Sequence, residues 1–308
     1  VIGVSGGVDS TYVAYLTKQW GLRALAIHLD NGWDSELAVS NIEKTLTKLG
    51  IELYTHVIDW EEFKDLQLSY FKANVVDIEA LTDHAIIGTL HKLAYRHGIK
   101  YILSGNNIVT EGILPKYWIF NKADGINIKD IHAKFGSLPL KTYPLFSTRM
   151  KKYHMNVKGI KTIPLLNYMD YNKQNVKQII TADLGWRDYG GKHYESIFTR
   201  FYQGYILPVK FDIDKRKAHL SSLICSGQIS RNEALEELKR EIYDPAQLKV
   251  DKDFVLKKLG FTEEEFNTYL ATPRREHTEF KFERGMWDDI PLIKPLRPIW
   301  QLVRKVIK

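Results

Sequence analysis

Four short apolar runs alternate with segments of helical periodicity over the first hundred residues, and this order limits the fold more than any other feature. The apolar runs cover residues 1–4, 25–29, 51–58 and 99–103, and the helical segments between them include residues 35–49, 60–73 and 83–97. Buried strands that alternate with helices form a parallel sheet with helices on both faces. We therefore predict a doubly wound α/β fold whose ligands bind at the carboxyl ends of the strands.

The pattern changes near residue 165. Helical segments follow at residues 173–181, 230–242 and 262–270, without comparable buried strands. We predict two regions: a sheet domain over residues 1–165 and a mainly helical region, for binding substrate or a partner, over residues 166–308.

Composition restricts the function classes. Of 308 residues, 44 are Lys or Arg and 37 are Asp or Glu, and the net charge of +7 is compatible with nucleic acid, acidic lipid or phosphorylated small molecules. The single cysteine, Cys225, excludes disulfides and multi-cysteine zinc sites, and we expect it to be buried and inert. We expect a reducing, cytoplasmic location, since no membrane-length apolar run or signal peptide is visible. The start without Met leads us to expect further residues upstream.

A glycine loop follows the first apolar run. It reads SGGVDS at residues 5–10 and leads into a segment with helical spacing. Glycines let backbone N–H groups approach an anion closely, and a helix N-terminus adds partial positive charge, so this loop predicts a phosphate cradle. Its spacing matches neither a Walker A loop nor a dinucleotide-binding fingerprint. A tight turn selected only for packing is the alternative.

The SGGVDS run resembles the signature of the PP-loop ATP pyrophosphatases, a superfamily that includes asparagine, NAD and GMP synthetases and tRNA thiolation and lysidine enzymes. The resemblance implies an adenine nucleotide alpha hydrolase-like domain that cleaves ATP, with Mg²⁺, to AMP and pyrophosphate. It implies that the residues holding pyrophosphate are Ser5, Gly6, Gly7, Asp9 and Ser10, of which Asp9 and Ser10 take part in catalysis. Asp30 and Asn31 end the second apolar run, and the switch-point rule places them near adenine or ribose.

A second polar turn follows the fourth apolar run. Residues 104–112 read SGNNIVTEG and are similar to a NAD synthetase segment that helps to hold ATP and Mg²⁺. The resemblance implies ATP contacts for Gly105, Asn106 and Thr110. It also implies that Glu111 joins Asp9 in a metal site, since Mg²⁺ favours carboxylate oxygens. An ordinary turn is the alternative for this segment.

Longer runs resemble a narrower family, the N-acetyl sugar amidotransferases of surface-polysaccharide biosynthesis typified by WbpG and PseA. The runs are TDHA at 82–85, YGGKHYESIFTRF at 189–201 and DKRKAHLS at 214–221. The resemblance implies an ATP-dependent carbon–nitrogen ligase of lipopolysaccharide O-antigen synthesis that converts an acetamido group of a UDP-linked N-acetyl sugar into an acetamidino group. A separate glutaminase subunit is the implied source of ammonia. Members usually begin with an extra segment that carries cysteine pairs, and this sequence shows none.

The last two runs place cations among aromatic residues. Arg and Lys suit the pyrophosphate of a nucleotide sugar, as a planar fork and as a point charge, and a solvated basic surface is the alternative. The predicted substrate-binding residues are Lys192, His193, Arg200, Lys215, Arg216 and His219, and the predicted catalytic residues of this segment are Lys192, His193 and Glu195. His193 or Glu195 would accept the proton that ammonia loses, and the sequence does not rank them.

Residues 141–161 hold six basic residues and no acidic one. This stretch fits three roles: binding RNA phosphates in a tRNA-modifying PP-loop enzyme, neutralising the triphosphate of ATP with Lys141 as a catalytic residue that stabilises the leaving pyrophosphate, or an ordinary exposed face. RNA is the weaker expectation, and DNA is not expected as a partner. A non-catalytic nucleotide-binding subunit is a rival of another class.

The tail at residues 294–308 carries five basic residues and no acidic one, with apolar residues between them. This pattern fits a peripheral helix on anionic lipid. A terminal helix docked on its own domain is the preferred alternative.

Overall fold

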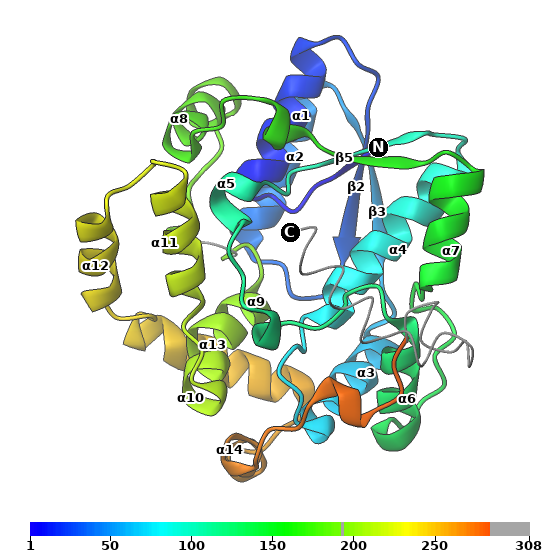
Figure 1. Cartoon of the computed structure of the whole chain (residues 1–308), viewed down its shortest axis with the longest axis vertical. Helices are drawn as coiled ribbons and strands as arrows, with labels where there is room; N and C mark the ends of the chain where they lie inside the picture. The colour runs from blue at the N-terminus through cyan, green and yellow to red at the C-terminus, as the bar shows by residue number, and fades with distance from the viewer. Residues whose placement is uncertain (192–193, 284–308) are drawn as a thin grey trace, which may run out of the picture.

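The computed structural model describes residues 1–191 and 194–283, and its centre is a five-stranded parallel sheet (Figure 1). The strand order is β3-β2-β1-β4-β5, with β1 (Ile2–Gly3), β2 (Leu25–Asp30), β3 (Glu52–Val57), β4 (Tyr101–Ser104) and β5 (Lys161–Pro164). Ile2 pairs with Ala26 on one side and with Leu103 on the other, so β1 is the middle strand. The four predicted strands are confirmed. The sequence does not predict β5, because its four residues alternate too briefly to stand out.

Helices connect and cover the strands. Their bounds are α1 (Val8–Gln19), α2 (Glu36–Leu49), α3 (Trp60–Ala73), α4 (Ala80–Arg96), α5 (Ile108–Glu111), α6 (Gly125–Phe135), α7 (Thr148–Lys152), α8 (Lys173–Leu184), α9 (Ile197–Phe201), α10 (Leu207–Phe211), α11 (Lys215–Cys225), α12 (Arg231–Lys239), α13 (Pro245–Leu259) and α14 (Glu263–Ala271). Shorter 3₁₀ or π turns are η1 (Lys116–Trp118), η2 (Tyr153–Val157), η3 (Leu165–Tyr168), η4 (Tyr202–Ile206) and η5 (His277–Glu279).

The sheet is covered on both faces, as the doubly wound prediction requires. On one face, α1, α2 and α8 bury apolar residues against Ile2 and Ala26. On the other face, α4 packs Leu93 and Ala94 against Ile27 of β2. The predicted fold class is therefore confirmed.

Helix α2 illustrates how the local sequence sets these elements. Its N-cap is Ser35, whose hydroxyl accepts a hydrogen bond from the N–H of Ala38 at 3.2 Å. Ile42, Leu46 and Leu49 are buried and recur at helical spacing, so one face of α2 packs on the sheet. The helix ends before Gly50, where the sequence predicts its end.

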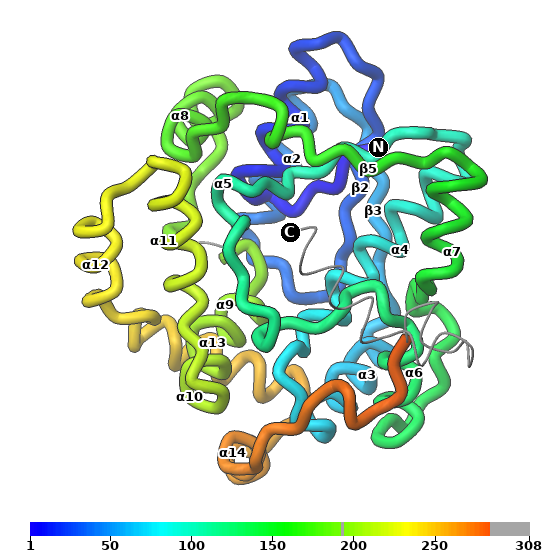
Figure 2. The backbone as a smooth tube through the Cα atoms, in the orientation of Figure 1, coloured from blue at the N-terminus to red at the C-terminus, as the bar shows by residue number. Residues whose placement is uncertain are grey.

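The helices after residue 165 share a core with the first part of the chain. Trp33, which follows β2, lies 5.2 Å from Phe198 of α9, and Phe71 of α3 packs edge-on against Tyr269 of α14 at 4.8 Å between ring centroids. All four belong to one buried cluster. Figure 2 shows α9, α10, α13 and α14 in the lower half of the molecule, the half that also contains α3. The described part of this region is helical, as predicted, and the boundary at residue 165 stays a prediction.

Within the described ranges, no helix is both long and apolar enough to cross a lipid bilayer. The predictions for Lys192, His193 and the tail at 294–308 concern residues outside those ranges.

Candidate functional site

The predicted phosphate loop connects β1 to α1 through a backbone conformation that glycine favours. Gly6 has a φ of +78°, and a Cβ atom at this position would lie 2.6 Å from the carbonyl oxygen of Ala38. The indole N–H of Trp186 donates to the Gly6 carbonyl oxygen at 2.9 Å. The loop is therefore held from two sides, and position 6 has no room for a side chain.

Two serine hydroxyls close this loop. The Ser5 N–H donates to Ser10 Oγ at 3.3 Å, and Ser10 Oγ donates to the Gly7 carbonyl oxygen at 3.2 Å. Gly7 is the N-cap of α1 and has no side chain with which to cap the helix. The first turn of α1 therefore has no side-chain cap, and the N–H groups of such a helix N-terminus are the usual anion site.

The second predicted segment meets the first at Asp9. A Cβ atom on Gly105 would lie 3.0 Å from the backbone carbon and 3.1 Å from the Cβ of Asp9. Beyond Gly105, the side chain of Asn107 caps α5 by accepting from the N–H of Thr110 at 2.8 Å and from its hydroxyl at 3.1 Å. Asn106 is exposed next to this cap. The structure thus brings together the two motifs that the sequence predicts as one ATP site.

Helix α11 holds α5 in place. His219 Nδ1 donates to the Thr110 carbonyl oxygen at 2.9 Å, and Ser226 Oγ donates to that of Val109 at 3.1 Å. The hydroxyl of Ser222 accepts from the N–H of Ile113 at 3.0 Å. His219, predicted as a substrate-binding residue, therefore contacts the backbone that carries Thr110 and Glu111.

Tyr171 is a further residue of this site that the sequence does not predict, and its hydroxyl donates to Asp9 Oδ1. Burial and the negative charge of Asp9 raise the pKa of Tyr171, with a further contribution from Glu111, so the phenol keeps its proton. Its carbonyl oxygen accepts from Gln228 Nε2 at 2.8 Å. No local motif marks Tyr171, because it reaches Asp9 from a loop 162 residues further along the chain.

The segment before α9 lies against the phosphate loop. A Cβ atom on Gly7 would lie 3.2 Å from the hydroxyl of Tyr189 and 3.4 Å from Glu195 Oε1. The Ser35 N–H donates to the Glu195 carbonyl oxygen at 2.8 Å, and Asp34 forms a β-bridge with Ser196. Burial and the charge of Glu195 raise the pKa of Tyr189. The run that resembles the sugar amidotransferases therefore packs against the predicted phosphate loop.

These residues fit ATP with Mg²⁺. Asp9 lies in the uncapped first turn of α1, and the charge of Glu111 acts on the same Tyr171 hydroxyl that contacts Asp9. Among residues 1–191 and 194–283, no three His, Cys, Asp or Glu side chains form a metal-binding group by themselves. A Mg²⁺ ion here would therefore share its coordination between carboxylates, phosphate oxygens and water, as is usual at nucleotide sites.

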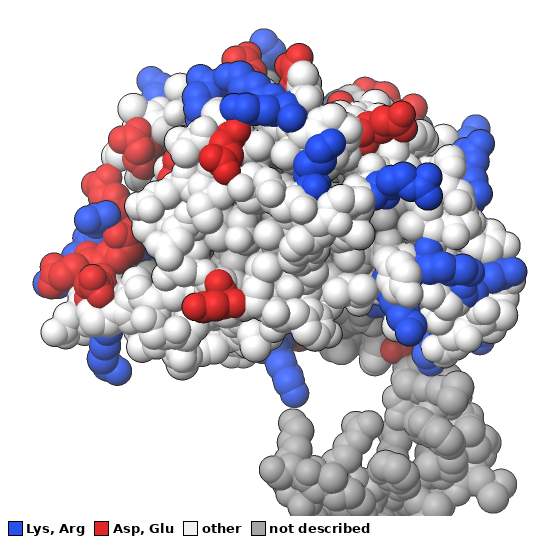
Figure 3. All heavy atoms as spheres, turned by 90° about the horizontal axis from the view of Figure 1, so that it is seen from above, with Lys and Arg blue, Asp and Glu red and all other residues white. Residues whose placement is uncertain are grey.

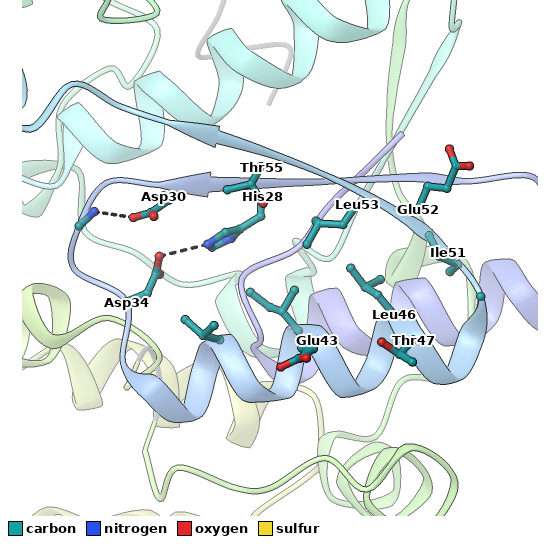
Figure 4. Close-up of a pocket in the computed structure, with 14 residues that line it drawn as sticks. His28, Asp30, Asp34, Glu43, Leu46, Thr47, Ile51, Glu52, Leu53 and Thr55 are labelled. Carbon is teal, nitrogen blue, oxygen red and sulfur yellow. Dashed lines mark hydrogen bonds and ion pairs between the residues drawn. The ribbon is translucent and has the colours of Figure 1, made fainter.

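The polar residues that end β2 have different roles. The amide of Asn31 is buried, where it donates to Thr82 Oγ1 at 3.0 Å and accepts from the Trp33 N–H at 3.2 Å. Asp30 accepts from the Gly32 N–H at 2.8 Å and lines a cavity of about 680 Å³ between α2 and the strands β2 and β3 (Figure 4). The adenine or ribose contacts predicted for Asp30 and Asn31 stay predictions, and Asn31 is already used to connect β2 with α4.

Three of the predicted phosphate-binding cations form ion pairs within the protein. Arg200 makes a two-point contact with Asp251 at 2.6 and 2.9 Å, and Arg216 contacts Asp214 at 2.8 Å. Lys215 lies 3.6 Å from Glu79. Binding a phosphate through either arginine would require these pairs to open, so the substrate role of these cations stays a prediction.

Two further expectations meet a different environment. Lys141 is exposed. The next residue, Thr142, donates to Glu62 in the first turn of α3. The role predicted for Lys141 at the pyrophosphate stays a prediction.

Cys225 is exposed, so the prediction of a buried cysteine is wrong. It is the last residue of α11, where the helix turns outward into Ser226 and Gly227.

Comparison with known proteins adds the following similarities. Residues 195–294 match the family model of the LPS biosynthesis protein WbpG-like, C-terminal domain. The chain is 32% identical over 123 residues to the tRNA-specific 2-thiouridylase MnmA of Sulfurimonas denitrificans, covering 36% of this chain and 35% of that protein. It is 34% identical over 71 residues to the tRNA(Ile)-lysidine synthase of Chlamydia pneumoniae, covering 22% of each. The chain thus spans about a third or less of these relatives. The matches support the WbpG-like resemblance and the PP-loop superfamily.

Proposed function

We propose that this chain is an ATP-dependent amidotransferase that converts an acetamido group of a UDP-linked N-acetyl sugar into an acetamidino group in surface-glycan synthesis. The observation that carries the proposal is the close approach of Gly7 in the predicted phosphate loop to Glu195, at the start of the segment that matches the WbpG-like domain. The loop implies ATP cleavage and the matched segment implies the sugar amide. Their contact supports a single site for both.

The first step activates the amide, because its oxygen is a poor leaving group. The amide oxygen attacks the α-phosphorus of ATP, a P–O bond forms, and the bond from the α-phosphorus to the bridging oxygen breaks, so pyrophosphate leaves. The N–H groups of the loop and of the α1 N-terminus would bind the charge that develops on pyrophosphate. When bound, Mg²⁺ neutralises phosphate charge, and Asp9 and Glu111 are the residues that would hold it.

The second step forms the new C–N bond. Ammonia attacks the imidate carbon, the C–O bond breaks, AMP leaves with the bonding electrons, and the nitrogen loses one proton. We assign that proton to Glu195, and the position of its carboxylate beside Gly7 supports the assignment. His193 stays the other candidate.

The proposal includes a glutaminase subunit that supplies the ammonia, and a cytoplasmic location, where ATP and nucleotide sugars are found. Ammonium salts are expected to support turnover by the chain alone, whereas glutamine is expected to support it only when that subunit is added.

The direct test measures pyrophosphate release. The purified chain is incubated with ammonium chloride, Mg²⁺-ATP and a panel of UDP-acetamido sugars, and the product is identified by mass spectrometry. We expect release with at least one sugar, loss of release in Asp9→Ala and Ser10→Ala, and unchanged release in Ser137→Ala, which alters an exposed serine. Absence of pyrophosphate with every sugar contradicts the proposal, and AMP formation excludes a non-catalytic nucleotide-binding subunit.

A tRNA-modifying enzyme is the second candidate, because the relatives named above act on tRNA and because Arg149, Lys152 and Lys161 are exposed in the basic stretch. Lysidine-type chemistry needs no catalytic cysteine, so a single Cys225 does not oppose it. On the face seen in Figure 3, basic side chains form separate groups around a broad centre with few charges. Salt-dependent binding of tRNA with ATP consumption in its presence would favour this candidate.

A further inference from the structure

A chain of hydrogen bonds connects helix α11 with the carboxylate of Asp9. Gln228 follows α11 and is tied to it by its N–H, which donates to the Leu223 carbonyl oxygen at 2.9 Å. The Gln228 side chain donates to the Tyr171 carbonyl oxygen at 2.8 Å and accepts from the Lys173 N–H at 3.2 Å. Tyr171 then donates its hydroxyl to Asp9 Oδ1. The orientation of Asp9 therefore depends on residues far from the phosphate loop in sequence.

Tyr171 is suited to hold this carboxylate in one orientation. Its side chain is 3% exposed and lies 6.3 Å from the ring of Tyr12 on α1, so the ring has little freedom to move. A fixed donor selects one rotamer of Asp9 and sets the direction of the second carboxylate oxygen.

The other predicted metal ligand is held by the same helix. His219 and Ser226 donate to the carbonyl oxygens of Thr110 and Val109, which are on the helical turn that ends at Glu111. Helix α11 and the turn after it therefore contact both the segment that orients Asp9 and the segment that carries Glu111. The relative position of the two carboxylates depends on α11, which lies within the residues that match the WbpG-like domain.

We propose that Tyr171 is a positioning residue that orients Asp9 for the metal–nucleotide complex, and that α11, acting through Gln228, sets this orientation. The inference rests on the proposed use of ATP with Mg²⁺ at this loop. It assigns a role in the nucleotide site to the C-terminal part of the chain, and it gives Tyr171 no contact with substrate.

The test replaces the phenol while keeping the ring. Mn²⁺ serves as the probe, and its binding to the full chain is measured by electron paramagnetic resonance with the non-hydrolysable analogue α,β-methylene-ATP. Tyr171→Phe is expected to weaken Mn²⁺ binding about ten- to a hundred-fold, the range typical for the partners of metal ligands. Binding of the analogue without metal is expected to stay within about two-fold. The matched control is Tyr15→Phe, which removes another tyrosine–aspartate hydrogen bond from α1, to the exposed Asp183 at 2.7 Å.

A second variant tests the connection to α11. Gln228→Leu keeps the approximate size of the side chain but removes both hydrogen bonds, and a smaller weakening of Mn²⁺ binding in the same direction is expected. If Tyr171→Phe does not fold, the Mn²⁺ affinity of Gln228→Leu alone tests the inference. Mn²⁺ affinity equal to wild type in both variants overturns the inference, because a purely structural tyrosine would alter only the thermal unfolding midpoint. Wild-type protein that binds Mn²⁺ and the analogue, with the expected loss in Tyr171→Phe, but forms no AMP from ATP, contradicts the proposed function and leaves this inference standing.

Discussion

Gly105, the residue after β4, closely approaches Asp9 at the start of α1, since a Cβ atom on Gly105 would lie 3.0 Å from the Asp9 backbone. Two segments almost a hundred residues apart therefore pack together at the predicted nucleotide site. The distance between them depends on the absence of a side chain at position 105.

Gly105→Ala is expected to lower ATP affinity about ten-fold and stability by about 1–3 kcal/mol, because the added methyl group must push the β4 turn away from α1. Equilibrium binding of ATP and urea unfolding measure the two effects. Gly125→Ala is the control, since a Cβ there meets its nearest neighbour at an ordinary 3.7 Å. Equal changes in ATP affinity and stability in the two variants would show that the close approach of Gly105 to Asp9 affects neither quantity.

Trp186→Phe removes the indole N–H that donates to the Gly6 carbonyl oxygen. We expect a loss of about 1–3 kcal/mol in the free energy of unfolding, from the unpaired buried carbonyl and the smaller ring, together with weaker ATP binding as the loop loosens. Trp20→Phe is the matched control because Trp20 is 51% exposed. Unchanged ATP affinity in Trp186→Phe would mean that the loop keeps its shape without this hydrogen bond.

Asp251→Asn breaks the two-point ion pair with Arg200, in which both side chains are largely buried. Removing one member of a buried pair leaves the other charge uncompensated, and a loss on the order of 3–5 kcal/mol is expected in urea unfolding. Glu263→Gln, which disrupts the more exposed pair with Lys252, is expected to cost less than about 1 kcal/mol. If Asp251→Asn is as stable as wild type, the ion pair contributes little to folding and opening it costs little. Arg200 could then bind a ligand, which would support its predicted substrate role.

His91 gives stability a dependence on pH. Burial, with smaller contributions from His154 and Lys151, lowers the pKa of His91 to about 4. A lowered histidine pKa favours the neutral form in the folded state, so its contribution is complete above the unfolded pKa of about 6.5 and is lost as the pH falls toward 4.

The measurement compares urea unfolding of wild type and His91→Phe between pH 7 and pH 4. Phenylalanine keeps the stacking on Phe146, whose ring lies 5.0 Å away. We expect the wild type to lose on the order of 2–3 kcal/mol more than the variant over this range. Parallel curves would contradict the neutral state of His91.

The sequence predicts the sheet and the course of the loop at residues 5–10 well, because both depend on local signals. Strand residues such as Ile27 and Ile102 are buried in apolar runs, and the loop that contains Gly6 leads into α1 as the sequence predicts. The contact between Gly105 and Asp9 follows from topology, since β1 and β4 are neighbours and their carboxyl ends meet.

The sequence does not predict which polar side chains form ion pairs or hydrogen bonds with other residues of the protein. Arg200 is read from its neighbours as a phosphate ligand, but its partner Asp251 lies 51 residues away on α13. Tyr171 is missed for the same reason, because only tertiary structure brings it to Asp9. The types and spacing of residues in the sequence indicate which chemical groups a site could use. Ion pairs and hydrogen bonds between residues far apart in the sequence decide which of those groups can still bind a ligand.

The aromatic cluster that joins Trp33 and Phe71 to Phe198 and Tyr269 has a consequence for how the molecule is built. A chain cut between the sheet and the later helices would leave large rings of both halves facing water. We therefore expect the half that contains the sheet not to fold stably without the later helices. Heat or a destabilising mutation in either half is expected to unfold both halves in one cooperative transition.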